Sequence, residues 1–285
     1  MATTTLVATV TGFKTPESVR YDAAADAYYV ANINGGPNNK DNNGFISRVT
    51  ADGIIDSLKL VSGGRDGVTL HAPKGSVLVG DTLWVTDIDA VRGFNTRTGM
   101  PVASVDLTKQ KAVFLNDIAL GPDGALYVTD TGIRFAADGS MSHPGKDRIF
   151  RIASDRRSVT VVVEGDTLGR PNGIVWDGTN SRFVLAGFNS PNILAWRIGD
   201  SAPTVIATGP GGYDGLDVLG DGRIIVSSWA DSSISAVTGS GVTRLITGIS
   251  APADFAVDTR RGRIAIPRFE NDQVEIHTIP ARDRS

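Results

Sequence analysis

Four oxygen-bearing side chains stand at equivalent positions of a segment that recurs six times along the 285-residue chain. They are Glu17, Asn116, Asn172 and Asp214, and the equivalent positions of the other two copies hold Lys74 and Ala253. Because a repeat of this kind closes into a ring, we expect these six positions, called the anchors, to converge around a central channel. Two carboxylates and two amide oxygens suit Ca²⁺ or another hard divalent cation, whereas the lack of His in the set disfavours Zn²⁺. A solvated polar rim is the alternative interpretation.

A cation at the anchors would support hydrolysis of a carbonyl compound. It would polarise a lactone or ester carbonyl and stabilise the oxyanion formed on attack. A carboxylate beside it could take a proton from water or attack directly. The chain has no Cys and no Gly-x-Ser-x-Gly motif, so the sequence does not favour a Ser or Cys nucleophile. The expected reaction is therefore metal-assisted hydrolysis of a small-molecule substrate.

Three further residues are candidates for contacting that substrate. Lys74 either pairs with Glu17 or a loop carboxylate, or it holds an anionic substrate. Trp229 follows a predicted strand and either forms an apolar wall of the site or packs at its rim. His71 precedes Lys74 and is a candidate proton shuttle, since an unperturbed imidazole titrates near neutral pH.

The elements that must position these residues are short strands. Each copy of the repeat starts with an anchor, often after Pro, and continues with an apolar segment, a turn and a run of β-branched or aromatic residues. In the third copy the apolar segment is 115–120, the turn consists of Gly, Pro and Asp, and the second run is 126–130. Successive anchors are roughly 40 to 57 residues apart, and the shorter separations match the length of a four-stranded propeller blade. The sequence predicts an all-β, six-bladed β-propeller, with two stacked sandwiches as the alternative.

The two ends of the chain are expected to share one blade. The sixth copy reaches only its third strand, at 273–278, and the segment 6–12 resembles the fourth strands of the other copies. Pairing the first and last segments leaves no open sheet edge between them. We therefore expect residues 1–285 to form a single propeller domain that is closed by its N-terminal strand.

Two loops are longer than their counterparts in the other copies. The additional residues fall in 31–44 and 131–147, each between the second and third strands of a blade. In an antiparallel blade these loops lie on the same face as the anchors, so both insertions are expected over the channel mouth. Loops on a rigid scaffold often carry function, although surface insertions are also tolerated without one.

Composition excludes several other classes of protein. The chain has 28 Lys and Arg against 31 Asp and Glu and no basic run, so nucleic-acid binding is not expected. Apolar runs such as 159–163 are far shorter than a membrane span. The first five residues lack the segments of a signal peptide, which leaves a cytoplasmic location and a periplasmic or secreted one both open. Oligomeric state is not indicated.

Four short motifs resemble a known protein family. They are Pro16-Glu17, Leu115-Asn116-Asp117, Pro171-Asn172-Gly173 and Asp214-Gly215-Leu216. Together, over residues 17–270, they are similar to the Glu/Asn/Asn/Asp set of the gluconolactonase, senescence-marker protein and luciferin-regenerating enzyme family, and more distantly to diisopropylfluorophosphatase and the paraoxonases. The resemblance implies a divalent cation, commonly calcium, held by Glu17, Asn172 and Asp214. It also implies that Asn116 is a fourth ligand or touches the substrate, and that Asp214 is the base or nucleophile.

One departure from the family pattern affects the expected substrate. Sugar-lactone hydrolases of the family commonly have Arg two residues before the blade-3 Asn, where this chain has Phe114. Phe114 is therefore expected to line the substrate pocket, and a more apolar lactone or ester is favoured over an aldonolactone. The resulting hypothesis is a calcium-dependent hydrolase of a lactone or related ester. The alternative is a non-enzymatic propeller that binds a ligand or a protein through its channel face.

Overall fold

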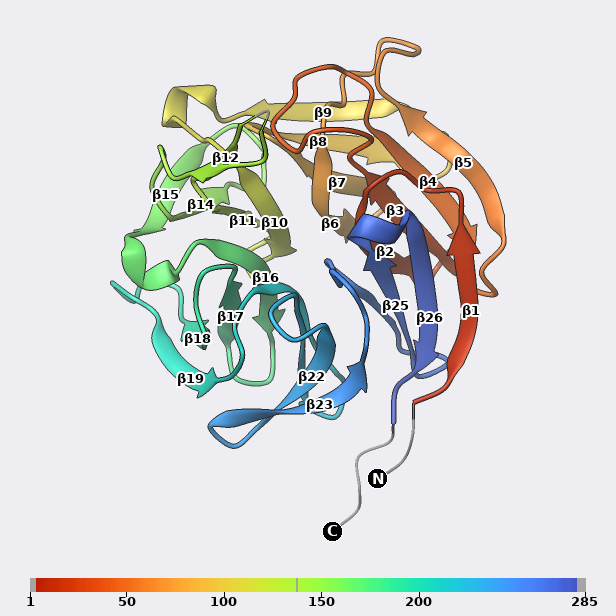
Figure 1. Ribbon diagram of the computed structural model, residues 1–285. Coiled ribbons are helices and arrows are strands. Elements are labelled where there is room, and N and C mark those ends of the chain that lie inside the picture. The colour runs from red at the N-terminus through yellow and green to blue at the C-terminus, as the bar shows by residue number, and fades with distance from the viewer. Residues whose placement is uncertain (1–3, 137, 281–285) are drawn as a thin grey trace.

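The computed structural model describes residues 4–136 and 138–280 and arranges them as six four-stranded antiparallel sheets around a central axis (Figure 1). The first three blades, each from the inner to the outer strand, are β2 (Pro16–Asp22), β3 (Ala27–Asn32), β4 (Phe45–Thr50) and β5 (Ile55–Ser62); β6 (Pro73–Val79), β7 (Thr82–Asp87), β8 (Ala90–Asn95) and β9 (Pro101–Asp106); and β10 (Leu115–Leu120), β11 (Leu126–Asp130), β14 (Arg148–Ile152) and β15 (Val159–Glu164).

The remaining three blades complete the ring. They are β16 (Pro171–Asp177), β17 (Arg182–Gly187), β18 (Asn192–Trp196) and β19 (Thr204–Thr208); β20 (Tyr213–Val218), β21 (Ile224–Ser228), β22 (Ser233–Thr238) and β23 (Gly241–Thr247); and β24 (Ala256–Asp258), β25 (Arg263–Arg268), β26 (Gln273–Thr278) and β1 (Leu6–Thr11). The predicted six-bladed propeller is confirmed. Residues 1–3, part of the N-terminal segment considered above, lie outside the described residues.

The last blade closes the ring as the sequence predicts. β1 pairs antiparallel with β26, with Thr9 opposite Glu275 and Val10 opposite Val274. Val10 packs in one core cluster with Val274 of β26 and Val19 of the first blade. The N-terminal strand therefore covers the edge of the last blade and joins it to the first.

The inner strand of the last blade is shorter than expected. The repeat places it at 252–257, whereas β24 spans only Ala256–Asp258. The preceding segment bonds instead to the neighbouring blade: the amide of Asp254 donates to the carbonyl of Glu17 at 3.0 Å, and the amide of Val19 donates to the carbonyl of Asp254 at 2.9 Å. These bonds tie the last blade to the first at the centre of the ring.

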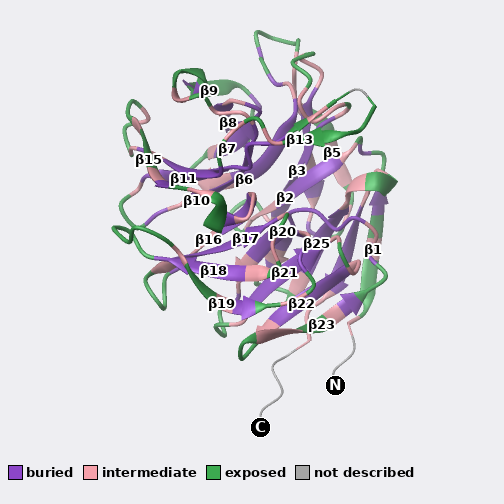
Figure 2. Ribbon diagram, turned by 60° about the vertical axis from the view of Figure 1, so that its left-hand side comes forward, coloured by how far each residue is buried: buried purple, intermediate pink, exposed green. Residues whose placement is uncertain are grey.

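Apolar side chains of adjacent blades pack together and hold the ring rigid. Between the third and fourth blades, the ring centroid of Tyr127 lies 4.4 Å from that of Phe183 and 6.1 Å from that of Trp196. Figure 2 shows the buried residues concentrated in the inner strands, with exposed residues on outer strands such as β9. Burial at roughly 25 cal/mol per Å² makes these contacts the main source of stability.

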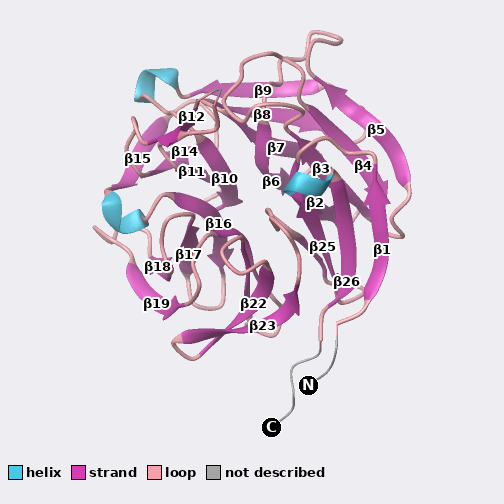
Figure 3. Ribbon diagram, viewed as in Figure 1, coloured by secondary structure: helices cyan, strands magenta, loops and turns pink. Residues whose placement is uncertain are grey.

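Helical structure is confined to single turns in the described part of the chain (Figure 3). The turns are 3₁₀ helices, η1 (Thr108–Gln110), η2 (Asp166–Leu168) and η3 (Phe269–Asn271). None of the described helices is long and apolar enough to cross a membrane.

Both long insertions lie over the same end of the channel. The segment between β3 and β4 is irregular, whereas the insertion between β11 and β14 contains a small hairpin, β12 (Arg134–Phe135) and β13 (Met141–Ser142), that the sequence analysis did not predict. The amide of Phe135 donates to Oδ1 of Asn38 at 2.9 Å, which links the two insertions. Together they roof the cavity described next.

Candidate functional site

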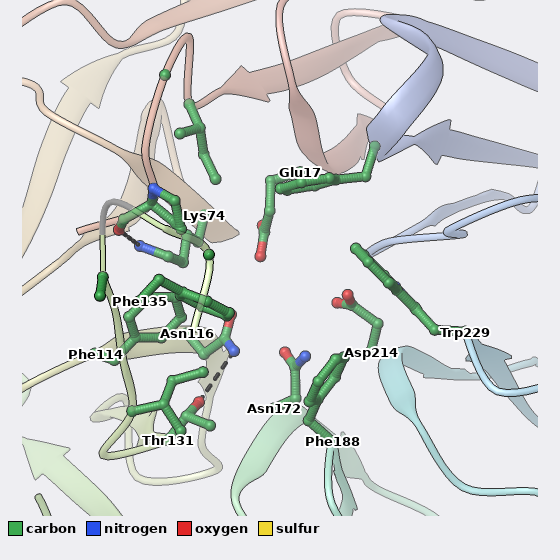
Figure 4. Close-up of a pocket in the computed structure, with 17 residues that line it drawn as sticks. Glu17, Lys74, Phe114, Asn116, Thr131, Phe135, Asn172, Phe188, Asp214 and Trp229 are labelled. Carbon is green, nitrogen blue, oxygen red and sulfur yellow. Dashed lines mark hydrogen bonds between the residues drawn. The ribbon is translucent and has the colours of Figure 1, made fainter. Parts of the chain in front are cut away.

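The anchors of the first five blades converge on one cavity of about 390 Å³ at the insertion-bearing end of the channel. Figure 4 shows Glu17, Asn116, Asn172 and Asp214 directed from four inner strands into a common space. All four side chains are buried. Lys74, Phe114 and Trp229 also line this cavity, so the structure brings together seven of the eight candidate site residues.

A β-bulge directs each of these anchors toward the channel. In the first five blades the anchor follows the first paired residue of the inner strand, and the register then shifts because the inner strand holds one extra residue. A bulge of this kind re-aims a side chain and interrupts the ladder. In β2, for example, Pro16 pairs with Asn32 and Ser18 with Ala31, so Glu17 is the unpaired residue.

Hydroxyl groups of one blade hold the backbone of the next anchor. Each donates to an anchor carbonyl: Ser18 Oγ to Lys74 at 2.6 Å, Thr86 Oγ1 to Asn116 at 2.5 Å, Thr129 Oγ1 to Asn172 at 2.7 Å, and Ser227 Oγ to Ala253 at 3.1 Å. These bonds satisfy carbonyl groups that have no partner in the ladder of their own sheet. They also fix the spacing between neighbouring anchors.

Close packing between blades explains the glycine that follows three of the anchors. A Cβ atom on Gly215 would lie only 2.6 Å from Cα of Asp254, and Gly173 faces the backbone of Asp214 in the same way. Gly75 meets the backbone of Asp117. The Gly in these motifs therefore permits the inner strands to approach closely enough for the anchors to share one cavity.

Carboxylates at the ends of second strands support the segments before the anchors. Asp130, the last residue of β11, accepts hydrogen bonds from the amides of Phe114 at 2.8 Å and Val113 at 3.2 Å. Asp87, the last residue of β7, accepts from the amides of Ala72 and His71 at 2.8 and 3.1 Å. These side chains position Phe114 at the cavity wall and Lys74 at its edge.

The two buried acidic anchors repel each other. Burial, and then the nearby Asp214 carboxylate, raise the pKa of Glu17 well above its usual range, while Lys74 acts in the opposite direction. Burial raises the pKa of Asp214 to about 8, the Asp117 carboxylate adds to the rise, and Trp229 and Asn172 oppose it. Both carboxylates are therefore poorly compensated by the groups around them.

The donor set fits a divalent cation. Oε2 of Glu17, Oδ1 of Asn116 and Oδ1 of Asp214 are buried and have no hydrogen-bond partner among the described residues. Buried oxygens normally have a partner, so three that converge without one are suited to coordinate a cation. The described residues contain no group of three or more His, Asp or Glu side chains that could hold a metal. The carboxylates of Glu17 and Asp214 would therefore need the amide oxygens of Asn116 and Asn172 as further ligands.

Lys74 is held by backbone carbonyls. Its ammonium donates to the carbonyls of Pro37 and Ala72, both at 3.1 Å, and lies 4.2 Å from the ring centroid of Phe114. Burial lowers the pKa of Lys74 to about 8, and Glu17 opposes this effect. The ion pairs of the described residues do not include one between Lys74 and Glu17, so the two charges interact only at longer range.

The other candidate contacts differ in their relation to the cavity. Trp229 lies directly after β21 and packs between Phe188 and Phe269, so it is both a wall of the cavity and part of a rim cluster. His71 is not among the described residues that line the cavity, and its Nδ1 accepts a hydrogen bond from the amide of Asn42 at 3.0 Å. Its proposed role as a proton shuttle stays a prediction that this placement does not favour.

Sequence reasoning missed several cavity residues. Thr131, Phe135, Phe188 and Phe269 line the site, but none of them occupies an anchor position. Thr131, Phe188 and Phe269 each follow the second strand of a blade, and Phe135 belongs to the β12–β13 hairpin. Phe188 and Phe269 directly follow β17 and β25, just as the predicted Trp229 follows β21. The position after the second strand of a blade is therefore the signal that would have identified them.

The sequence analysis also missed a second cluster of charged side chains, which is formed by Arg20, Asp117, Asp217 and Asp254. Nη2 of Arg20 is 3.3 Å from Oδ2 of Asp254, and the Asp117 and Asp217 carboxylates act on the same guanidinium. Burial raises the pKa of Asp117 to about 6, which Arg20 opposes. Asp117 also accepts hydrogen bonds from the amides of Ile118 and Ile174 at 2.7 and 2.8 Å, so this cluster joins neighbouring blades.

Comparisons with known proteins bear on the family and the fold of the chain. A family model described as "SMP-30/Gluconolactonase/LRE-like region" matches residues 15–258. Among solved structures, a protein provisionally described as a gluconolactonase is 16% identical with a TM-score of 0.70, covering 99% of this chain and 93% of that one. A luciferin-regenerating enzyme is 11% identical with a TM-score of 0.70, covering 97% and 96%.

A chain from a nidogen/laminin complex is 19% identical with a TM-score of 0.61, covering 79% of this chain and 76% of its own. A search of the curated proteins found no significant match. At these identities the likeness to the solved structures establishes the fold alone.

Proposed function

Since the chain belongs to the SMP-30/gluconolactonase/LRE-like family, we propose that it is a metal-dependent hydrolase of a lactone or related ester. Family membership supports a lactonase-type propeller. The finer elements of the proposal are that a divalent cation, calcium in the first instance, binds at Glu17, Asn172, Asp214 and Asn116, and that Asp214 acts as the base or nucleophile. The substrate is a small molecule.

One observation carries this proposal. Three buried oxygens of Glu17, Asn116 and Asp214 converge without partners in the described chain, in a cavity that also receives Asn172. A solvated polar rim would expose these atoms to water, whereas their side chains are nearly inaccessible. A bound cation would compensate both carboxylates and favour their ionised forms.

The chemistry follows from the position of Asp214 beside the other anchors. When bound, a divalent cation would polarise the substrate carbonyl and stabilise the developing oxyanion. In its carboxylate form Asp214 would take a proton from water or attack the carbonyl carbon directly. Trp229 and Asn172 favour that carboxylate form. The aromatic walls would limit the access of bulk water to the reacting group.

Replacement of the acidic anchor tests the assignment. Asp214→Asn keeps the size of the side chain and one oxygen but removes the charge and the basic lone pairs. With metal content verified in each preparation, turnover of a panel of sugar lactones, aliphatic lactones and aryl esters should fall by about 10² or more. The control Asp52→Asn changes an exposed carboxylate and should leave turnover unaltered.

The same panel separates hydrolysis from binding without turnover. Full activity of metal-replete Asp214→Asn would refute the role of Asp214. A wild-type protein that binds calcium but is inert toward every lactone and ester would instead favour a propeller that binds a ligand or a protein through its channel face.

A further inference from the structure

The walls of the cavity are built by two groups of aromatic side chains that face each other. Phe114 and Phe135 form one group, with ring centroids 6.0 Å apart. Trp229 forms the other group with Phe188 and Phe269, at centroid distances of 5.8 and 5.3 Å. Figure 4 shows Phe114 and Phe135 across the central space from Trp229 and Phe188. A molecule in the cavity would therefore lie between aromatic surfaces.

Three polar side chains of the cavity, those of Asn116, Thr131 and Lys74, are bonded within the protein. The amide nitrogen of Asn116 donates to Oγ1 of Thr131 at 3.0 Å, and that hydroxyl donates to the carbonyl of Pro171 at 2.8 Å. The ammonium of Lys74 donates to the carbonyls of Pro37 and Ala72. Two of the three ammonium hydrogens of Lys74 and one of the two amide hydrogens of Asn116 are therefore used within the protein, so that one hydrogen of each group is left for a ligand.

Four buried polar atoms of the cavity lining have no hydrogen-bond partner among the described residues. They are Oε2 of Glu17, Oδ1 of Asn116, Oδ1 of Asp214 and Nε1 of Trp229. The cavity thus offers polar groups where a carbonyl would react and apolar surface around the rest of a ligand. Small-molecule sites with this division usually orient the ligand by the few polar groups and bind its body by apolar contact.

We infer that the site selects a lactone or ester with an apolar, ring-sized body over a polyhydroxylated sugar lactone. The test of this inference by substrate turnover rests on the proposed hydrolysis, whereas the test by ligand binding does not. A hydroxyl of a sugar lactone would lose its hydrogen bonds to water when it packs against these aromatic walls. Each hydroxyl that gains no new partner there should lower kcat/KM by roughly tenfold or more. An alkyl or aryl body instead gains from leaving water.

The first experiment compares substrates on calcium-supplemented wild-type protein. δ-Octalactone and glucono-δ-lactone share a six-membered ring and an alkoxide leaving group, so each kcat/KM is divided by the uncatalysed rate of the same lactone. Dihydrocoumarin adds an aromatic body. The apolar lactones should be favoured by about 10² or more. Equal values, or a preference for glucono-δ-lactone, would overturn the inference and leave the proposed hydrolysis standing.

Variants connect the preference to the aromatic walls. Phe135→Ala and Phe188→Ala should each raise KM for dihydrocoumarin by about tenfold with a smaller change in kcat, and leave KM for glucono-δ-lactone nearly constant. Met141→Ala is the matched control, because Met141 pairs with Phe135 in the same hairpin but is exposed and does not line the cavity. The same loss in all three variants would count against the inference.

Binding without turnover separates this inference from the proposed function. Calorimetry would compare 2-tetralone, a carbocyclic analogue of dihydrocoumarin that cannot be hydrolysed as a lactone, with 1,5-anhydroglucitol. Binding of 2-tetralone that is weakened in Phe188→Ala, with no binding of the polyol, supports the apolar site even if no lactone is hydrolysed. Preferential binding of the polyol, or no binding of either probe, contradicts it.

Discussion

Replacing Asp214 by Asn should stabilise the metal-free protein while it removes catalysis. In the folded chain without a cation, burial raises the pKa of Asp214 to about 8 from an ordinary value of 3.8. An unfolded chain would therefore release this proton near pH 3.8 while the folded chain retains it. Folding is thus disfavoured as the pH rises between these two values. Asn has no proton to release and avoids this effect.

The size of the effect follows from the same pKa shift. Below pH 3.8 both states are protonated and the group contributes no penalty, and above about pH 8 the penalty is constant. At pH 7 about three pKa units of the shift apply, so at 1.36 kcal/mol per unit the wild type should lose about 4 kcal/mol relative to Asp214→Asn. At about 2 °C per kcal/mol for a large domain, the variant should melt roughly 8 °C higher.

The assay is thermal unfolding after exhaustive chelation, at pH 7 and again near pH 4. The advantage of Asp214→Asn should shrink at the lower pH, where the wild-type carboxyl is protonated in both states. Asp177→Asn is the control: Arg182 donates to this buried carboxylate at 3.0 Å, so that variant should melt below the wild type. A metal-free Asp214→Asn protein that is less stable than the wild type at pH 7 would refute the raised pKa of Asp214, and with it the argument that the carboxylate form needs a cation.

Two further predictions concern the buried charges around the site. Arg20→Met leaves Asp254 and its neighbouring carboxylates without their cation. It should therefore lower the free energy of unfolding at pH 7 by about 3 kcal/mol, as measured by urea denaturation. A variant as stable as the wild type would contradict the role of Arg20. Lys74→Met should tighten calcium binding on the order of tenfold by calorimetry, since one positive charge that acts on Glu17 is removed; unaltered affinity would show that the ammonium does not influence the site.

The sequence predicted the ring and its anchors because repeat equivalence converts a local motif into a position in space. Glu17 and Asp214 are almost 200 residues apart in the chain, yet each is the second residue of an inner strand and both line one cavity. The closing pair of β1 and β26 was also predictable, since the last copy lacked a fourth strand. Both the shared position of the anchors and the pairing of β1 with β26 could be predicted from the regular spacing of the repeat.

Features outside the repeat could not be predicted in the same way. The β12–β13 hairpin belongs to an insertion, and the place of Phe135 in the cavity depends on a hydrogen bond to Asn38 in another blade. The cluster of Arg20 with Asp254 forms because the segment before β24 bonds to β2 instead of extending its own strand. His71 lay close to an anchor in sequence, but its ring bonds to the backbone of Asn42. Sequence proximity does not determine which side of a loop a ring faces.

The central claim is that a cation held by the anchors is required for hydrolysis, and the most direct measurement is lactone turnover against free calcium concentration. Starting from protein whose metal removal has been verified, turnover should be absent and should return along a saturable curve. Glu17→Gln should shift that curve to higher calcium, because Glu17 supplies one of the unpartnered buried oxygens. Wild-type turnover that persists undiminished after complete metal removal would contradict the account.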